Sequence, residues 1–488
     1  MTPFSVTVGN RSANLRVLAW PAALASLVAL TCGLSAADTA RRGATETALD
    51  RYIAKPDPSF AWKKVTEVRD ESATAYSLDM VSQQWLTPAE VNRTEWRHWV
   101  TIIKPDNLAH STALLFINGG SNRAGPGAAP RPGREFVELA KATRSVVVEL
   151  RMVPNQTIVF GGDGKERKED DLIAYSWDKY LRTGDERWPA RLPMTKAAVR
   201  AMDATTAFLT SGEGGNAKVD TFMVAGASKR GWTTWTTAIV DRRVVAILPM
   251  VIDILNVEAS ITHHFRAYGF YAPAVGDYSA HHIMDWLGTP ESKALYTIED
   301  PFAYRDRLTL PKLLMNACGD QFFLPDSSQF YFDALPGPKY LRYIPNTDHS
   351  LKDTDAMDTL RAWHHAIINQ TPLPQVTWKH GSDGALSVKS SVKPRRVLLW
   401  QAVNPNARDF RIESLGPVWT SSPVEEQDGT FSASPAKPDK GWAAYMMELT
   451  FDTAAGVPLK LTTNVTVAPD TLPFAAANVS RPSGFLAK

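Results

Sequence analysis

The sequence of 488 residues predicts an α/β protein, with a mostly parallel sheet flanked by helices, followed by a smaller all-β region. Between residues 111 and 368, continuous apolar runs typical of buried parallel strands alternate with helical patterns. From about residue 372 the pattern changes to short alternating strands without an evident helix. The length also exceeds one ordinary core and therefore predicts two domains.

Composition and charge exclude several classes of partner. The chain has 44% apolar and 21% charged residues, which is typical of a globular protein. Its formal net charge of +2 gives no reason to expect nucleic acid or an anionic membrane as a partner. The sequence does not indicate an oligomeric state.

The N-terminus has the pattern of a Sec-type signal peptide. Two arginines precede the apolar run Val17–Leu30, and the small-residue segment 33–38 follows it. We predict a signal peptide over residues 1–37, cut after Ala36 or Ala37. The mature protein is then periplasmic or secreted and has no stable membrane anchor.

Residues 45–371 carry the alternation of strands and helices. The helix predicted at Arg134–Thr143 lies between two buried strands, as in a parallel βαβ unit. The strands predicted here include Ser111–Ile117, Ser145–Leu150, Thr221–Val224, Val244–Ile252, Leu313–Ala317 and Tyr340–Ile344. Two segments, near residues 154–193 and 258–300, are predicted as insertions, and the second would cover the carboxyl edge of the sheet as a lid.

Residues 372–488 are predicted to form a separate β-sandwich domain. Turn residues separate its strands at intervals, as in small immunoglobulin-like or fibronectin-like domains. The predicted strands are Gln375–Lys379, Arg396–Ala402, Phe431–Pro435, Ala443–Asp452 and Leu459–Val467.

The segment Val224–Trp232 contains a candidate nucleophile. Its apolar strand ends in small residues, Gly226 and Ala227, directly before Ser228, and a helical pattern follows. A serine between a buried strand and a helix is the context of a nucleophile elbow. The common pattern has glycine two residues after the serine, where this chain has Arg230. The simpler alternative is a strand-to-helix turn without chemistry.

Ser228, Asp320 and His349 follow three predicted buried strands in that order. In α/β-hydrolases the triad runs in the order Ser, acid, His, and ligands gather at the carboxyl ends of the strands. We predict that Ser228 is the nucleophile, His349 the general base and Asp320 the residue that orients the imidazole. Asp253, which ends the preceding strand, and Asp326, close after Asp320, are alternative acids.

We expect the oxyanion donors just after the ends of two predicted strands. One is the backbone N–H of Lys229, directly after the serine, and the other comes from Gly119, Gly120 or Ser121. A tight turn without a catalytic role is the alternative at the glycine pair.

Two residues beside the serine, Arg230 and Trp232, are candidate substrate contacts. His263 and His264 are adjacent and would point apart on a helix, and no third ligand is evident. We therefore predict no metal and no other cofactor.

Several distinctive motifs resemble those of the PhoPQ-activated pathogenicity-related proteins, from about residue 45 to the C-terminal end. The similar segments are 153–156, 169–175, 192–196, 201–203, 226–232, 319–326, 348–351 and 441–445. The resemblance implies an exported α/β-hydrolase-like protein with a C-terminal immunoglobulin-like or fibronectin-like domain, and it implies no substrate. The serine turn is also similar to that of glucuronoyl esterases, in which an arginine at the position of Lys229 contributes to the oxyanion hole.

The predicted function is that of an exported serine hydrolase, an esterase or a peptidase, acting on a small molecule, peptide or glycan. A peptidase that binds a substrate ammonium group needs acidic residues, and Glu166, Glu169, Asp170 and Asp171 lie in the first insertion. We interpret them as a solvated charge run. The alternative function is a non-catalytic peptide- or glycan-binding protein on a hydrolase scaffold, for which Arg230 in the elbow is the supporting observation.

Overall fold

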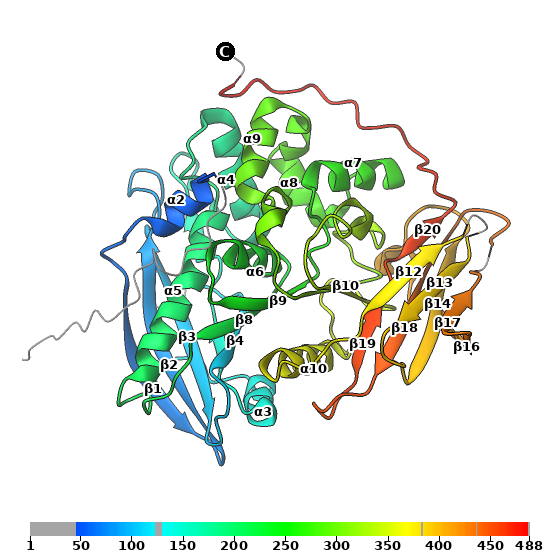
Figure 1. Ribbon diagram of the computed structural model, residues 1–488. Coiled ribbons are helices and arrows are strands. Elements are labelled where there is room, and N and C mark those ends of the chain that lie inside the picture. The colour runs from blue at the N-terminus through cyan, green and yellow to red at the C-terminus, as the bar shows by residue number, and fades with distance from the viewer. Residues whose placement is uncertain (1–44, 123–128, 382–383, 436, 487–488) are drawn as a thin grey trace, which may run out of the picture. The chain divides into compact units, whose positions relative to one another are not determined.

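One long mixed β-sheet runs through the protein, with helices packed on both faces (Figure 1). The computed structural model describes residues 45–122, 129–381, 384–435 and 437–486. The predicted signal peptide lies outside these residues. Within them, no helix has the length and apolar character needed to cross a membrane.

The middle of this sheet is parallel, as the continuous apolar runs predict. Its strands, in spatial order, are β5 (Val147–Leu150), β4 (Thr112–Ile117), β8 (Thr221–Ala227), β9 (Val244–Met250), β10 (Lys312–Ala317) and β11 (Lys339–Ile344). Three antiparallel strands continue the sheet beyond β5, namely β3 (Glu95–Pro105), β2 (Ala73–Gln84) and β1 (Ala61–Arg69).

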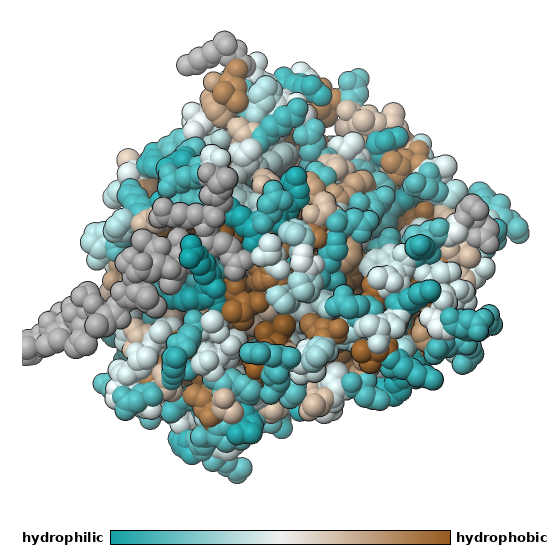
Figure 2. All heavy atoms as spheres, in the orientation of Figure 1, coloured by the Kyte–Doolittle hydropathy of each residue, from teal (hydrophilic) through white to brown (hydrophobic). Residues whose placement is uncertain are grey.

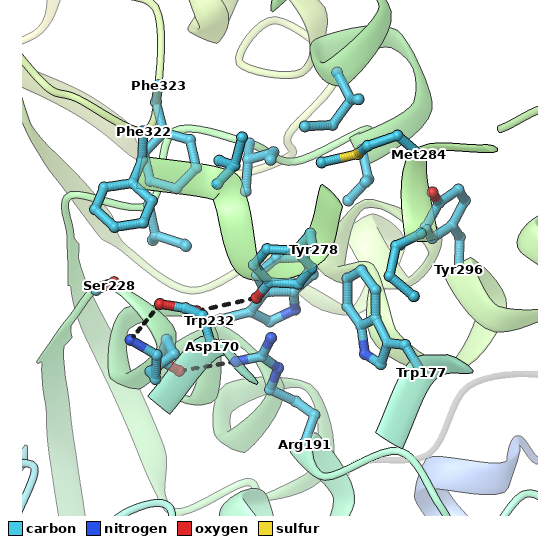
Figure 3. Close-up of a pocket in the computed structure, with 17 residues that line it drawn as sticks. Asp170, Trp177, Arg191, Ser228, Trp232, Tyr278, Met284, Tyr296, Phe322 and Phe323 are labelled. Carbon is cyan, nitrogen blue, oxygen red and sulfur yellow. Dashed lines mark hydrogen bonds and ion pairs between the residues drawn. The ribbon is translucent and has the colours of Figure 1, made fainter. Parts of the chain in front are cut away.

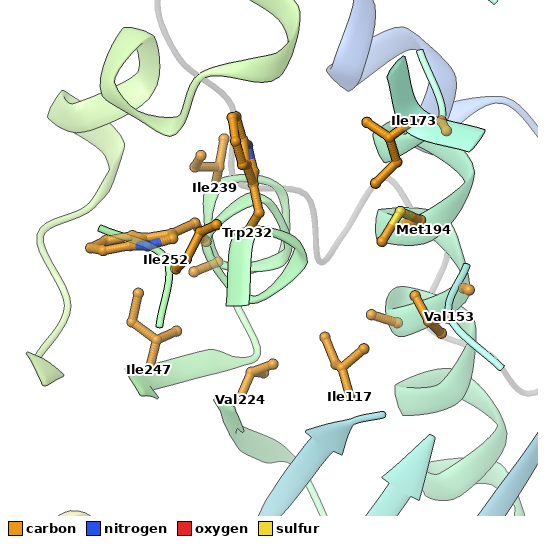
Figure 4. Packing of buried hydrophobic residues seen from close by; sticks show 14 of the residues in the cluster. Ile117, Val153, Ile173, Met194, Val224, Trp232, Ile239, Ile247 and Ile252 are labelled. Atoms are coloured by element: carbon orange, nitrogen blue, oxygen red, sulfur yellow. The ribbon is translucent and has the colours of Figure 1, made fainter. Parts of the chain in front are cut away.

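Alternate residues of each central strand face two separate apolar clusters, one on each side of the sheet. In β8, Val224 joins the cluster under α5 (Arg191–Thr210) and α6 (Lys229–Val240). Met223 joins the cluster under α3 (Arg134–Thr143) and α10 (Ala356–Ile368). Figure 4 shows Val224 and Ile117 facing Trp232 and Ile239 of α6. The helices are α2 (Ala48–Ala54), α3 (Arg134–Thr143), α5 (Arg191–Thr210), α6 (Lys229–Val240) and α10 (Ala356–Ile368).

The two insertions are largely helical and contact each other. The Tyr278 hydroxyl donates to Asp170 at 3.1 Å, and His281 lies 2.6 Å from Asp171. The first insertion contains β6 (Ile158–Val159), β7 (Glu166–Arg167) and α4 (Glu169–Thr183). The second contains α7 (Val257–Tyr268), η1 (Pro273–Val275), α8 (Gly276–Ala280), η2 (Ile283–Trp286) and α9 (Pro290–Glu299), and η3 (Pro301–Arg307) and η4 (Ser327–Phe330) follow.

The C-terminal strands are antiparallel and continue the central sheet. β19 pairs with β11 through Leu341 and Thr462, so the predicted C-terminal β region shares a sheet with the α/β part. This pairing covers the backbone of β11, which would otherwise be an exposed edge. The added strands are β14 (Arg396–Asn404), β15 (Thr420–Pro423), β18 (Trp442–Phe451), β19 (Leu459–Thr462) and β20 (Thr466–Ala468).

A second, four-stranded sheet packs against these strands. Leu386 and Phe431 of this sheet share an apolar cluster with Met447 of β18, which is the face-to-face contact expected of two sheets. Its strands are β12 (Val376–His380), β13 (Leu386–Ser390), β17 (Thr430–Ala433) and β16 (Glu426–Gln427). A four-residue helix, α11 (Ile412–Leu415), interrupts the region where the sequence shows no helix.

The last described residues run back from β20 over the helices of the insertions (Figure 1). Gly269 and Gly184 end α7 and α4, and a Cβ at either would lie within 3 Å of a ring carbon of Phe474 or Phe485. The Leu486 amide donates to Glu291 of α9. The C-terminal segment therefore holds the insertion helices against each other.

A buried ion pair joins the two parts of the long sheet. Arg342 of β11 contacts Glu448 of β18, and their side chains are 2% and 3% exposed. Arg342 also contacts Asp355 at 3.0 Å, just before α10. Removing one partner of a buried pair leaves a charge without compensation, which is strongly destabilising.

We expect Glu448→Leu to lower the free energy of unfolding by about 3 kcal/mol, because Asp355 compensates the buried Arg342 only in part. Urea unfolding measures this change. The exposed Asp452, paired with Arg395, provides the control, and Asp452→Ala should cost below about 1 kcal/mol. The double variant Arg342→Met/Glu448→Leu should recover most of the loss. An equal effect of the single variant and the control would contradict the role of this pair.

Candidate active site

Ser228 occupies a strained turn between β8 and α6. Its φ is 57° and its ψ is −127°, a backbone conformation that few residues other than glycine adopt. The Ser228 amide donates to Met250 of β9 at 2.8 Å, and the Ser228 carbonyl accepts from Trp232 at 2.9 Å. These bonds hold the serine at the carboxyl edge of the sheet.

Gly231 explains why this turn tolerates an arginine two residues after the serine. A Cβ at Gly231 would lie 2.9 Å from the carbonyl oxygens of Gly226 and Met250. A Cβ at Gly226 would lie 2.7 Å from the Arg230 carbonyl oxygen. The helix therefore approaches the strand most closely at Gly226 and Gly231, and position 230 can carry a long side chain.

The two cations after the serine bind the start of α4. The Lys229 ammonium lies 2.9 Å from Glu169 and 3.0 Å from Asp170, and Arg230 donates to Glu169 at 2.6 Å. Burial raises the pKa of Glu169, but the hydrogen bond and charge of Arg230 and the charge of Lys229 outweigh it and lower the pKa to about 2. The interpretation of these acids as a solvated charge run is therefore wrong for Glu169 and Asp170, because both form ion pairs with the cations after the serine. These partners are fifty-nine or more residues away in sequence.

Arg230 also contacts the loops after β5 and β4. Its Nε donates to the Val153 carbonyl at 2.5 Å, and a Cβ at Gly119 would lie 2.8 Å from its Nη2. The Gly119 amide donates to the Asn118 side chain at 2.8 Å, while Gly120 has a φ of 135°. Asn118 in turn donates to Glu149 of β5 at 2.8 Å. This polar support of the glycine pair could not be predicted from the local sequence pattern.

Asp320 and His349, which follow β10 and β11, are hydrogen-bonded. His349 Nδ1 lies 2.8 Å from Asp320 Oδ2, and the amide of Phe322 donates to Asp320 Oδ1 at 2.7 Å. Asp320 is 3% exposed. His349 Nε2 is buried and makes no hydrogen bond within the described part of the chain, so it is not bonded to Ser228 in this structure. The imidazole packs on Phe322, with ring centres 4.3 Å apart.

The two alternative acids lie in other hydrogen-bonded groups. The hydroxyls of Tyr331 and Tyr343 each contact one oxygen of Asp253 at 2.5 Å. Complete burial raises the pKa of Asp253 to about 7, although both hydrogen bonds act in the opposite direction. Asp326 lies 2.6 Å from Arg408 and 3.1 Å from His263.

A cavity of about 50 Å³ lies next to the serine (Figure 3). Ser228, Lys229 and Phe322 line one end, and aromatic and aliphatic side chains, many of them from the two insertions, line most of the rest. Trp232 lines the cavity, and its indole N–H donates to the Glu299 carbonyl at 2.6 Å. Other lining residues were not predicted as site residues, namely Trp177, Arg191, Tyr278, Met284 and Tyr296. Their aromatic enrichment in the insertions was the available signal.

The adjacent histidines point to different partners. His263 contacts Asp326, whereas His264 Nε2 accepts from the Ala272 amide at 3.0 Å. Among the residues that the structure describes, no three His, Cys, Asp or Glu side chains form a group able to hold a metal ion.

The mixed sheet, its flanking helices and the strained serine between strand and helix define an α/β-hydrolase-like protein. The chain belongs to the family of PhoPQ-activated pathogenicity-related proteins, whose sequence model matches residues 49–411. This confirms the family predicted from the motifs.

The chain is also similar to a curated protein and to several solved structures. It is 36% identical over 462 residues to autocrine proliferation repressor protein A of Dictyostelium discoideum, covering 88% of this chain and 92% of that protein. Acetyl xylan esterase 1 from Thermoanaerobacterium sp. matches with a TM-score of 0.44 and 14% identity, over 67% of this chain and 93% of its own. An S-formylglutathione hydrolase from Agrobacterium tumefaciens matches with a TM-score of 0.39 and 15% identity, over 62% of this chain and 99% of its own.

The raised pKa of Asp253 predicts a pH-dependent contribution to stability. Between about pH 4 and pH 7 the folded protein holds a proton that the unfolded chain has lost, so this contribution falls as the pH rises and is constant above about 7. Relative to Asp253→Asn, the wild-type free energy of unfolding should fall by about 4 kcal/mol across this range. Chemical denaturation at several pH values measures this difference. The exposed Asp452→Asn variant is the control, and its difference from the wild type should not change with pH. An equally constant difference for Asp253→Asn would contradict the prediction.

Proposed function

We propose that the protein is an exported serine hydrolase that cleaves an ester or amide with Ser228, His349 and Asp320. The observation that carries this proposal is the Asp320–His349 hydrogen bond, together with a buried imidazole Nε2 that has no hydrogen-bond partner among the residues the structure describes. Phe322 packs on that imidazole and lines the same cavity as Ser228. Export rests on the signal-peptide pattern of residues 1–37.

The steps follow from these positions. Ser228 Oγ attacks the carbonyl carbon while His349 Nε2 accepts the hydroxyl proton, and a tetrahedral oxyanion forms. When the bond to the leaving group breaks, the imidazolium donates its proton to that group. Water then hydrolyses the acyl-enzyme by the same route. The hydrogen bond to Asp320 keeps the proton on Nδ1 and stabilises the imidazolium.

The environment of the serine favours particular oxyanion donors. The amide of Lys229 begins α6 directly after Ser228, as in other nucleophile elbows. The Gly119 amide already donates to Asn118, so we assign the second donor to the amide of Gly120. Each donor typically contributes about 3–4 kcal/mol to transition-state stabilisation.

Asp320 is the preferred acid because the alternatives have other partners. Two tyrosines bind Asp253, and Arg408 and His263 bind Asp326. Either carboxylate would have to leave these partners to reach His349.

The charges near Ser228 favour an esterase over an aminopeptidase. Lys229 and Arg230 neutralise Glu169 and Asp170, so these acids are not available as a pair for a substrate ammonium group. The non-catalytic binding protein is also less well supported. Its supporting observation was Arg230 in place of the usual glycine, but Gly231 provides the close approach of helix to strand that this glycine would allow.

We expect a fluorophosphonate probe to label the folded wild-type protein at neutral pH and not Ser228→Ala, because the probe reacts with an activated serine. Ser387 is a partly exposed residue of β13, so Ser387→Ala provides a matched control that should label like the wild type. In-gel fluorescence gives the readout. Absence of labelling in the wild type would favour the binding protein.

The assignment of the acid is tested by two substitutions of the same kind. Asp320→Asn should lower the turnover number by about 10⁴-fold, because the wrong imidazole tautomer is then favoured. Asp253→Asn should retain turnover within about tenfold, because Asp253 binds tyrosines rather than His349. Ester hydrolysis measures both variants, and the reverse order of the two losses would assign the acid to Asp253.

A further inference from the structure

We propose that the cavity beside Ser228 binds a short, uncharged, apolar acyl group of the substrate. This inference rests on the proposed function and adds a substrate class to it. The part of the cavity away from Ser228 is lined by Trp177, Met284 and Tyr296 (Figure 3). Aliphatic residues, including Ile254 and Val257, complete the wall. Burial of apolar surface against such a wall is the main available source of binding free energy.

The charged groups in the wall are paired within the protein. Asp170 contacts Lys229 at 3.0 Å and accepts from Tyr278 at 3.1 Å. Arg191 contacts Glu299 at 3.1 Å, and both side chains are almost completely buried. A charged acyl group would have to compete with these pairs in a buried site, which is unfavourable.

The place of His349 assigns the cavity to the acyl side of the scissile bond. The leaving group must lie near His349 Nε2 to receive a proton. Phe322 and Phe323 line the cavity and pack on the imidazole, whereas His349 is not a lining residue. The cavity instead extends from Ser228 and Lys229 towards the insertions (Figure 3).

The volume limits the length of the acyl chain. A cavity of about 50 Å³ holds roughly three or four water-sized groups, which matches a short chain such as butyryl. Tyr278 of α8 and Met284 of η2 come from the second insertion, and Trp177 comes from α4. Because these insertions contact each other and the C-terminal segment contacts both, the wall is supported on its outer side. Other apolar side chains reach the outer surface on the face shown in Figure 2, among mostly hydrophilic residues.

The test compares p-nitrophenyl esters that share one leaving group. We expect kcat/KM to rise about 15-fold from acetate to butyrate, because each buried methylene contributes about fourfold. It should fall again for octanoate, which exceeds the cavity. The charged hemisuccinate should react at least about tenfold more slowly than butyrate.

A variant at the distal wall tests the site directly. Met284→Ala should raise the octanoate-to-butyrate ratio of kcat/KM by about tenfold, because it lengthens the cavity. Met357 of α10 is 37% exposed and does not line the cavity, so Met357→Ala provides a control in which the ratio should not change. Circular dichroism of both variants checks that they are folded.

The outcomes separate this inference from the proposed function. Hydrolysis of all esters at equal kcat/KM, with an unchanged ratio in Met284→Ala, would overturn the acyl site and leave the serine hydrolase intact. A higher kcat/KM for acetate than for butyrate would likewise overturn the acyl site and leave the serine hydrolase intact. If no ester reacts and the wild type is not labelled by fluorophosphonate, both proposals are wrong.

Discussion

The four charges around the serine turn are the interaction on which the candidate site depends. Lys229 and Arg230 follow the serine, and Glu169 and Asp170 begin α4. The acids also lie where a helix N-terminus favours negative charge. This cluster fixes the first insertion on the elbow, and the insertion then forms one wall of the cavity. Because Arg230 also packs over Gly119, the same charges connect the serine with the loop that follows β4.

The fold could be predicted well wherever a local pattern determines the structure. A continuous apolar run is buried on both faces, so β4, β9, β10 and β11 lie within two residues of the predicted strands. Helix α3 has the predicted bounds, Arg134–Thr143, because its apolar spacing is complete over those residues. The predicted strand-to-helix turn at Ser228 likewise needs only the residues on either side of it.

The sequence could not predict features that depend on distant partners. The pairing of β19 with β11 joins Leu341 to Thr462, and no local pattern encodes it. The acidic run of α4 has the composition of a solvated surface, and its role depends on cations near the serine. The alternative acids differ in their partners, since the tyrosines that bind Asp253 lie 78 and 90 residues away. The order of the strand ends and the family motifs predicted the candidate site residues but not these contacts.

The shared sheet also determines when the protein can fold during its synthesis. β11, which precedes the loop of His349, receives its outer partner only when Leu459–Thr462 has been made. Leu459 follows Ile344 by 115 residues, which require about 6–23 s at ordinary ribosomal rates. During that interval the edge of β11 is open to incorrect strand pairing.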